Sequence, residues 1–489
     1  TIPAVSHALA RWDDGSIRWL GVDLLVPPQP GDVSLSGVLQ ARSSPDPLPG
    51  QLDLIPASGG QPLSVDVGHF LLSAGQTNGE FFQLVAPHGG LRGGMRVRLD
   101  TQTQPFFVAA GHSGTVEVEH SDDLSVTLVR RDLYEAVDGR DVFRLTTRAT
   151  VWRGHPGLRL QQSLDVLAGT HTVQGWAIEL PLEAPSADAE LVYGDGRSFP
   201  FSGDFSVTQE DWDTGFVNGN RRTISQPAIL ALEDTAVGLR HFWQKNPSAI
   251  RRHGDDLVVS FCPGSGDLVL DEGFGVTREM WMWIGPGVPT DLADMARTMD
   301  APPVVRASPG WHAESGVHGA LAAPQPGVDD DLELHLGESL DKIYEEWDLN
   351  PARHYSLQDF GDFFDRQHTV AYWGALQQEY DPGFVTLLQY ARTGDAWLLE
   401  RGMDLAWHFA DVDISWYGGA YQHRATRYHV DAWIAGIFGE SYQAECHASG
   451  YYDGSLDSIW RWVDQNFSLQ TYTDLQTWVD MAVRLGAEG

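Results

Sequence analysis

The chain has 489 residues, too many for a single hydrophobic core, so we expect two to four domains. Its 67 acidic and 32 basic residues give a formal net charge of -35, which excludes nucleic acid as an expected partner because phosphate binding needs a basic footprint. No apolar run approaches the ~18 residues that span a bilayer, so the sequence predicts no membrane span.

The front of the chain is typical of short β-strands. Residues 8–26 alternate apolar and polar side chains on both sides of Asp14-Gly15, a dipeptide that favours a hairpin turn. Loops rich in proline and glycine follow to about residue 65, and short strands are predicted from 66 to 112.

The middle of the chain alternates with a period of two residues, which indicates antiparallel strands with one wet face. Strands recurring at this density predict a β-sandwich. We expect the tryptophans within the β-rich part to be core residues, Trp281 and Trp283 among them. The predicted strand regions are 115–129, 141–164, 173–181, 227–232, 237–242, 256–262 and 277–284.

The last third of the chain changes to a helical period. A proline-rich linker begins at Ala301, and beyond about residue 335 apolar residues recur every three to four positions. Leu387 and Leu388 mark the apolar face of one helix, and Asp395 is the expected N-cap of the next. Further helices are predicted at 434–442, 459–467 and 475–485, so the paired helices form an incomplete ring.

Four segments in the same order resemble the rhamnogalacturonan exolyase-like family, that is, polysaccharide lyase family 26 and its bacterial relatives. They are Arg-Trp-Asp-Asp-Gly-Ser-Ile-Arg-Trp-Leu from Arg11, Trp-Arg-Gly-His-Pro-Gly-Leu-Arg-Leu from Trp152, Gly-Leu-Arg-His-Phe-Trp-Gln-Lys-Asn-Pro-Ser-Ala from Gly238, and Glu379-Tyr-Asp with Leu-Gln-Tyr-Ala-Arg-Thr-Gly-Asp from Leu388. Each motif is weakly specific alone, and the ordered set covers the chain from end to end.

The resemblance implies a fold and an activity. The expected fold is a small β-barrel-like domain (1–113), a central antiparallel β-sandwich (114–300), a linker (301–334) and an incomplete α/α toroid (335–489). The implied activity is β-elimination at a uronate-containing, rhamnogalacturonan-like anionic polysaccharide. It also places His241 and Lys245 near the seam between sandwich and toroid.

An elimination next to a uronic acid needs a cation for the carboxylate, a base for the α-proton and an acid for the leaving oxygen. Residues 417–431 supply every one of these types in a predicted loop between helices. Arg424 or Arg427 is the expected carboxylate partner. Base and acid are expected among His423, Tyr428 and His429.

Rings that stack on sugars and carboxylates or amides that grip hydroxyls gather around a predicted inner helix. The alternative for these side chains is to cap or brace neighbouring helices. The candidate substrate-binding residues are Asp362, Tyr372, Trp373, Gln378, Glu379, Tyr380, Asp381 and Tyr421.

No cofactor is expected to be required. Cys262 and Cys446 lie far apart and indicate small buried residues. Glycine-rich phosphate loops, His-Glu-x-x-His and Gly-x-Ser-x-Gly are all absent from the sequence. The acidic excess is typical of a solvated coat from a salty habitat, with structural calcium in Asp-rich loops as the alternative.

Two other functions stay open. A glycoside hydrolase would need two carboxylates about 5–9 Å apart across a cleft, for which Glu379, Asp381 and Asp362 are candidates. A non-catalytic carbohydrate-binding or extracellular structural protein would keep the architecture and lack turnover. Because the chain starts at Thr1 with no initiator Met, we expect a processed, secreted or cell-surface protein.

Overall fold

A computed structural model of the chain describes 4–24, 48–101, 107–108, 114–302, 306–349, 354–361, 382–408, 411, 414–415 and 450–451, with short gaps inside the longer ranges. The first element is the predicted hairpin, β1 (Ala4–Arg11) and β2 (Ile17–Leu24), paired antiparallel. In its turn, the Asp14 carboxylate accepts hydrogen bonds from the backbone N–H and the hydroxyl of Ser16.

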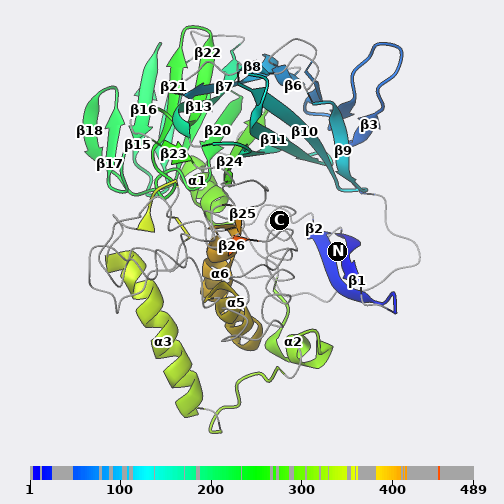
Figure 1. Cartoon of the computed structure of the whole chain (residues 1–489), viewed down its shortest axis with the longest axis vertical. Helices are drawn as coiled ribbons and strands as arrows, with labels where there is room; N and C mark the ends of the chain where they lie inside the picture. Colours follow the sequence, from blue (N-terminus) through cyan, green and yellow to red (C-terminus); the bar gives the residue numbers. More distant parts are fainter. Residues whose placement is uncertain are drawn as a thin grey trace.

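Two large antiparallel sheets dominate the described part of the chain (Figure 1). The first has ten strands in the order β15-β14-β19-β20-β24-β12-β11-β10-β8, with β9 also paired to β10. Its strands are β8 (Phe107–Val108), β9 (Val116–Ser121), β10 (Ser125–Glu135), β11 (Asp141–Trp152), β12 (Gly157–Val166), β14 (Ala189–Tyr193), β15 (Ser198–Phe201), β19 (Ala228–Leu232), β20 (Thr235–Leu239) and β24 (Gly275–Ile284).

The second sheet has twelve strands among the described residues, in the order β18-β17-β16-β21-β22-β13-β7-β6-β5-β4-β3, with β23 also paired to β13. They are β3 (Asp53–Ile55), β4 (Ser64–Asp66), β5 (Leu71–Ala74), β6 (Glu80–Val85), β7 (Arg92–Thr101), β13 (His171–Pro181), β16 (Phe205–Gln209), β17 (Thr214–Val217), β18 (Asn220–Thr223), β21 (Ser248–His253), β22 (Asp256–Cys262) and β23 (Leu268–Leu270). A short parallel pair, β25 (Ile414–Ser415) and β26 (Gly450–Tyr451), lies apart from both sheets.

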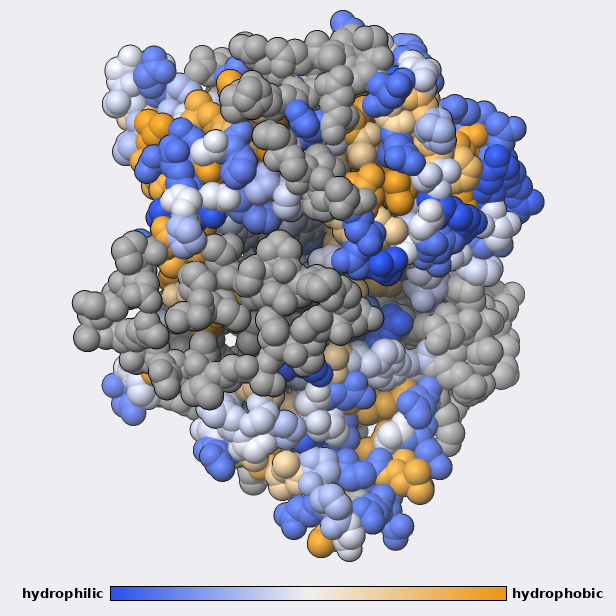
Figure 2. All heavy atoms as spheres, turned by 180° about the vertical axis from the view of Figure 1, so that it is seen from behind, coloured by the Kyte–Doolittle hydropathy of each residue, from blue (hydrophilic) through white to orange (hydrophobic). Residues whose placement is uncertain are grey.

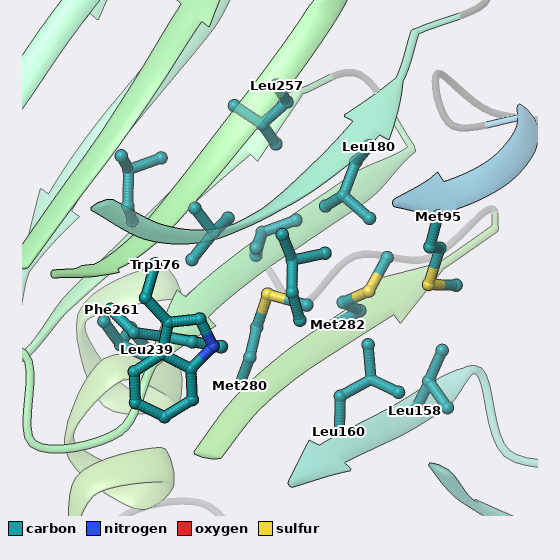
Figure 3. Packing of buried hydrophobic residues seen from close by; sticks show 14 of the residues in the cluster. Met95, Leu158, Leu160, Trp176, Leu180, Leu239, Leu257, Phe261, Met280 and Met282 are labelled. Carbon is teal, nitrogen blue, oxygen red and sulfur yellow. The ribbon is translucent and has the colours of Figure 1, made fainter. Parts of the chain in front are cut away.

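The two sheets face each other across one apolar core, so the predicted sandwich is confirmed. Figure 3 shows Trp176, Leu180 and Leu257 of the twelve-stranded sheet opposite Met280 and Met282 of the ten-stranded sheet. The Trp176 indole N–H, buried in this core, donates to the Gln162 side chain at 2.6 Å. Burial of apolar surface at about 25 cal/mol per Å² makes this core the main stabilising element of the β-part.

Several strand predictions need correction. The two predicted regions 115–129 and 141–164 each contain parts of two strands. Turns at 122–124 and 153–156 reverse the chain within them. The strands between residues 189 and 223 were missed, because several are only four residues long and the wholly exposed β18 has no apolar alternation. Trp281 and Trp283 do not lie in the sandwich core, since they point to the face opposite Met280 and Met282.

The helical part contains α1 (Leu292–Asp300), α2 (Pro309–Ser315), α3 (Asp330–Leu349), α5 (Pro382–Thr393) and α6 (Ala396–His408). The predicted turn between α5 and α6 is confirmed. Gly394 has φ +74°, a left-handed conformation that glycine adopts without strain, and its N–H bonds to the Tyr390 carbonyl at 2.7 Å. The Asp395 side chain then caps α6 by accepting from the Trp397 N–H at 3.0 Å.

The finer divisions of the chain stay predictions. The barrel-like domain is not confirmed, because β3–β7 belong to the twelve-stranded sheet of the sandwich. Within the predicted linker the chain forms α2 and the start of α3. The toroid is not confirmed either, since its predicted helices beyond α6 lie outside the described residues. None of the described helices has the length and apolar character that a membrane crossing requires.

Hydrophilic residues are spread over much of the described surface on the far face, over both the sheets and the helices (Figure 2). Cys262 is buried, as predicted. Among the residues that the structure describes, no group of three or more His, Cys, Asp or Glu side chains is arranged to hold a metal ion, so the calcium alternative stays a prediction.

The buried face of α5 is centred on Leu387, which is 3% exposed and packs with Leu398 and Leu405 of α6. Of the two residues predicted to mark this face, Leu387 is buried and Leu388 is only partly buried.

We expect Leu387→Ala to lower the free energy of unfolding by about 2–5 kcal/mol, because it leaves a cavity between α5 and α6. Urea denaturation followed by circular dichroism measures the change. Val385→Ala, at a side chain 45% exposed on the same helix, is the control and should change stability by no more than about 0.5 kcal/mol. Equal effects of the two variants would contradict this packing.

Candidate active site

The outer face of the ten-stranded sheet carries polar side chains that are buried beneath other elements. Along β12 and β24, residues alternate between the apolar core and this outer face, which places Gln161, Thr277 and Glu279 outside. The turn that follows β20, the segment around Phe360 and helix α6 meet them there. Together they enclose a cavity of about 30 Å³, lined by Gln161, Arg240, His241, Lys245, Thr277, Glu279, Phe360, Asp404 and Trp407.

The turn after β20 holds three of these side chains, Arg240, His241 and Lys245, and it has an unusual backbone conformation. His241 has φ +55°, which is rare for a residue other than glycine and concentrates at functional sites. The conformation is braced by Asp300 at the end of α1, whose carboxylate accepts the His241 N–H at 2.8 Å and the Gln244 amide at 2.7 Å. Asp300 thus positions His241 without lining the cavity.

The segment around Phe360 is tied to the same turn. The Asn246 side chain donates to the Tyr355 carbonyl at 2.9 Å, and the Leu357 N–H bonds to the Asn246 carbonyl at 2.7 Å. Phe360 then packs on the His241 ring with centroids 4.7 Å apart. Gly361, at φ +97°, lets this segment approach α6, since a Cβ there would clash with the Asp404 carbonyl oxygen.

Glu279 is a buried carboxylate held in its charged form. It accepts hydrogen bonds from the Trp281 indole at 2.6 Å and the Gln161 amide at 3.0 Å, and Arg240 lies 3.6 Å away. Burial opposes the charge, but the guanidiniums of Arg240 and Arg159 with these two hydrogen bonds outweigh it and lower the pKa of Glu279.

Asp404 of α6 behaves in the opposite way. Burial raises its pKa to about 7, although Arg401, 3.6 Å away, favours the charged form. Its carboxyl lies 4.0 Å from Nε2 of His241. Burial, with the positive charges of Arg240 and Lys245, holds the pKa of His241 well below its usual value. Below about pH 7 a protonated carboxyl therefore faces an unprotonated imidazole.

Lys245 adds an ammonium group to the cavity, and it is one of two lysines in the sequence. Its Nζ donates to the Thr277 carbonyl at 3.3 Å, and burial lowers its pKa. Asp411, just past α6, accepts from the Thr277 N–H at 2.9 Å and its hydroxyl at 2.7 Å. Burial raises the pKa of Asp411 too, while Lys245 opposes that shift.

The cavity, which is partly open, is thus lined by a proton donor, a proton acceptor and two cationic side chains. Two carboxyl groups whose pKa values are pushed in opposite directions are typical of acid–base catalytic sites. The arrangement can bind a small anionic group and move protons beside it.

The candidate residues named from the sequence lie outside the described residues and stay predictions: catalytic His423, Arg424, Arg427, Tyr428 and His429, and substrate-binding Asp362, Tyr372, Trp373, Gln378, Glu379, Tyr380, Asp381 and Tyr421. His241 and Lys245, which the family resemblance places at the seam between sandwich and helices, do line the cavity there. Sequence reasoning missed Asp404 and Glu279. The signal that could have found them is a charged residue among the apolar residues of a predicted helix (α6) or strand (β24).

No protein-family model and no curated protein matches the chain. It is partly similar to solved structures of a putative aldose 1-epimerase from Escherichia coli K12 (12% identity, 45% of this chain and 97% of that chain, TM-score 0.26) and a galactose mutarotase-like protein from Lactobacillus casei (12%, 46% and 100%, TM-score 0.28). A GH36 α-galactosidase from Geobacillus stearothermophilus is similar at 12% identity over 39% of this chain and 28% of that chain, with TM-score 0.25. Likeness at this level assigns neither family nor activity, so the lyase resemblance stays a prediction.

The stability of the folded chain should depend on pH through Asp404. In the folded protein the Asp404 carboxyl keeps its proton up to about pH 7, whereas an ordinary Asp loses its proton near pH 3.8. The contribution of Asp404 to the free energy of unfolding therefore falls as pH rises from 4 to 7. Asp404→Asn should remove this loss, worth at most about 1.4 kcal/mol per pH unit. Urea denaturation of both proteins at several pH values measures the difference.

Glu279→Gln tests a pH dependence of stability opposite to that of Asp404→Asn. The lowered pKa of Glu279 contributes stability above its ordinary value of 4.5, and that contribution is lost as pH falls through the folded pKa. The variant should therefore be less stable than the parent at neutral pH, and the gap should narrow in acid. Parallel pH profiles for the parent and Asp404→Asn would show that Asp404 is not held protonated.

Proposed function

We propose that the protein is a carbohydrate-active enzyme, a secreted or cell-surface polysaccharide lyase that cleaves a uronate-containing, rhamnogalacturonan-like glycan by β-elimination. The observation that carries the proposal is the pairing of Asp404 with His241 at 4.0 Å inside a cavity that also holds Arg240 and Lys245. In this proposal the four side chains supply the three roles that elimination requires.

The cavity has the size of a functional group rather than of a sugar. About 30 Å³ accommodates roughly two water molecules, so a carboxylate fits and a pyranose ring does not. The glycan would lie over the opening with the uronate carboxylate directed inward. Arg240 and Lys245 would receive the carboxylate and stabilise the extra negative charge that develops on it during proton removal.

The reaction then follows from the protonation states. Unprotonated His241 takes the proton from the carbon next to the carboxylate, and the electron pair of that C–H bond forms the new carbon–carbon double bond. The glycosidic C–O bond breaks, and Asp404 gives its proton to the departing oxygen. Proton transfer from His241 to Asp404 restores both groups, since they lie 4.0 Å apart.

The net charge of -35 opposes approach of a polyanion, because like charge slows association at long range. Salt at about 1 M shortens that repulsion to about 3 Å, so it does not reach beyond direct contact. The two cations of the cavity then decide local binding. An acidic coat of this kind suits an enzyme that works in a salty extracellular medium.

The family resemblance supports the same location. The segment from Gly238 to Ala249, one of the four that carry it, contains Arg240, His241 and Lys245. The cluster from Tyr421 to His429 stays a second candidate for the same roles.

A glycoside hydrolase is the second candidate function. It is favoured by the two carboxyl groups of the cavity, since a protonated Asp404 and an ionised Glu279 match the acid and the base or nucleophile of such enzymes. Hydrolysis yields new reducing ends without a double bond, so the products separate the two mechanisms.

The test is incubation with uronate-containing polysaccharides, rhamnogalacturonan among them, followed by near-ultraviolet absorbance and reducing-end assays. Elimination should produce absorbing, unsaturated ends. His241→Asn and Asp404→Asn should each lower kcat by at least about 100-fold, the usual contribution of a positioned acid or base. His253→Asn is the matched control, because that ring is 92% exposed on β21.

Reducing ends without absorbance would favour the hydrolase, and binding without any product would favour a non-catalytic carbohydrate-binding protein. Full activity of both cavity variants would move the site elsewhere. Loss of activity in Arg424→Ala and Arg427→Ala would then place it in the second cluster.

A further inference from the structure

The polar outer face of the ten-stranded sheet continues beyond the cavity into an aromatic surface. Trp281 stands two residues after Glu279 on β24 and points to the same side, about 7 Å further along the strand. Its indole N–H donates to the Glu279 carboxylate at 2.6 Å, which joins the aromatic surface directly to the wall of the cavity.

A second tryptophan extends this surface across the sheet. Trp152, at the end of β11, stacks parallel to Trp281 with an interplanar angle of 1° and ring centroids 5.4 Å apart. Strand β12 runs between β11 and β24, and it places Arg159 opposite Trp281. The two indoles therefore meet above β12.

Both rings are held in place from below and from the side. The Arg159 guanidinium lies 5.9 Å from the centroid of Trp281, and this arginine is only 2% exposed. His155 packs edge-on against Trp152 and also against Trp283. Each tryptophan remains partly accessible, although both are surrounded by protein groups. Rigid aromatic side chains of this kind bind a ligand with little loss of conformational entropy.

We propose that Trp152 and Trp281 form a sugar-binding subsite next to the cavity, and that it takes a neutral or weakly polar face of a glycan residue beyond the bond that is cleaved. A pyranose ring exposes C–H groups on its faces, which pack on indole rings, and hydroxyls at its rim. The inference rests on the proposed function for its substrate class. It adds the direction in which the glycan lies, along β24 from Glu279 toward Trp281.

The proposal predicts that the contribution of the tryptophans depends on ligand length. A single uronate residue held at the cavity does not extend onto the tryptophans, whereas a hexasaccharide does. With galacturonic acid and a rhamnogalacturonan hexasaccharide as probes, Trp152→Ala should raise Kd for the hexasaccharide by about tenfold, or about 1.4 kcal/mol, and leave Kd for the monosaccharide unchanged. Isothermal titration calorimetry with the full chain measures both constants.

Two further variants keep the test decisive. Trp152→Phe retains an aromatic face and should recover most of the hexasaccharide affinity that Trp152→Ala loses. If the Ala variant is correctly folded, a purely structural role of the indole would not predict this recovery. Trp311→Ala is the control, because Trp311 is 60% exposed on α2 and lies outside the sheet. Thermal unfolding of every variant checks that the fold is intact.

An equal loss of affinity for both probes, or no loss for either, would overturn the subsite. Its failure is distinct from failure of the proposed function. Length-dependent binding through Trp152 without cleavage would support the subsite and reject the enzyme. Cleavage with no dependence on Trp152 would support the enzyme and reject the subsite.

Discussion

Burial of ionisable side chains between a β-sheet and a helix is the constraint on which the proposed chemistry depends. Removing a charge from water is costly, so each buried group either finds partners or gives up its charge. Glu279 follows the first course, with Trp281 and Gln161 as hydrogen-bond donors, and Asp404 follows the second. One cavity is therefore lined by both an anion and a neutral acid.

The cavity can exist because the sandwich is stable without it. The apolar core between the two sheets is continuous across strands from both, and it fixes the backbone of β12 and β24. On their other face these strands can then carry the polar and charged residues that line the cavity. The strained conformation of His241 is supported in the same way, since Asp300 of α1 and the Asn246 contacts hold the turn from two sides.

The sequence predicted the parts of the fold that obey local periodicity. Alternation marked most long strands, Asp14-Gly15 marked the first hairpin, and Gly394-Asp395 marked the boundary of α5 and α6. Local patterns cannot say which strands pair, so they did not show that β3–β7 extend the large sheet. Asp404 was missed for a related reason. Its proton affinity arises from burial against residues far away in the sequence, and only the fold brings His241 beside it.

The scarcity of lysine has a practical consequence. A reagent that acylates amines can react with only two side chains in the whole sequence, and Lys245 is one of them. Lys245 lies in a cavity with room for roughly two water molecules, so an acylating reagent should reach it far more slowly than it reaches an exposed amine. The rate at which Lys245 is acylated would therefore report how accessible the cavity is, and a carboxylate bound in the cavity should slow that rate further.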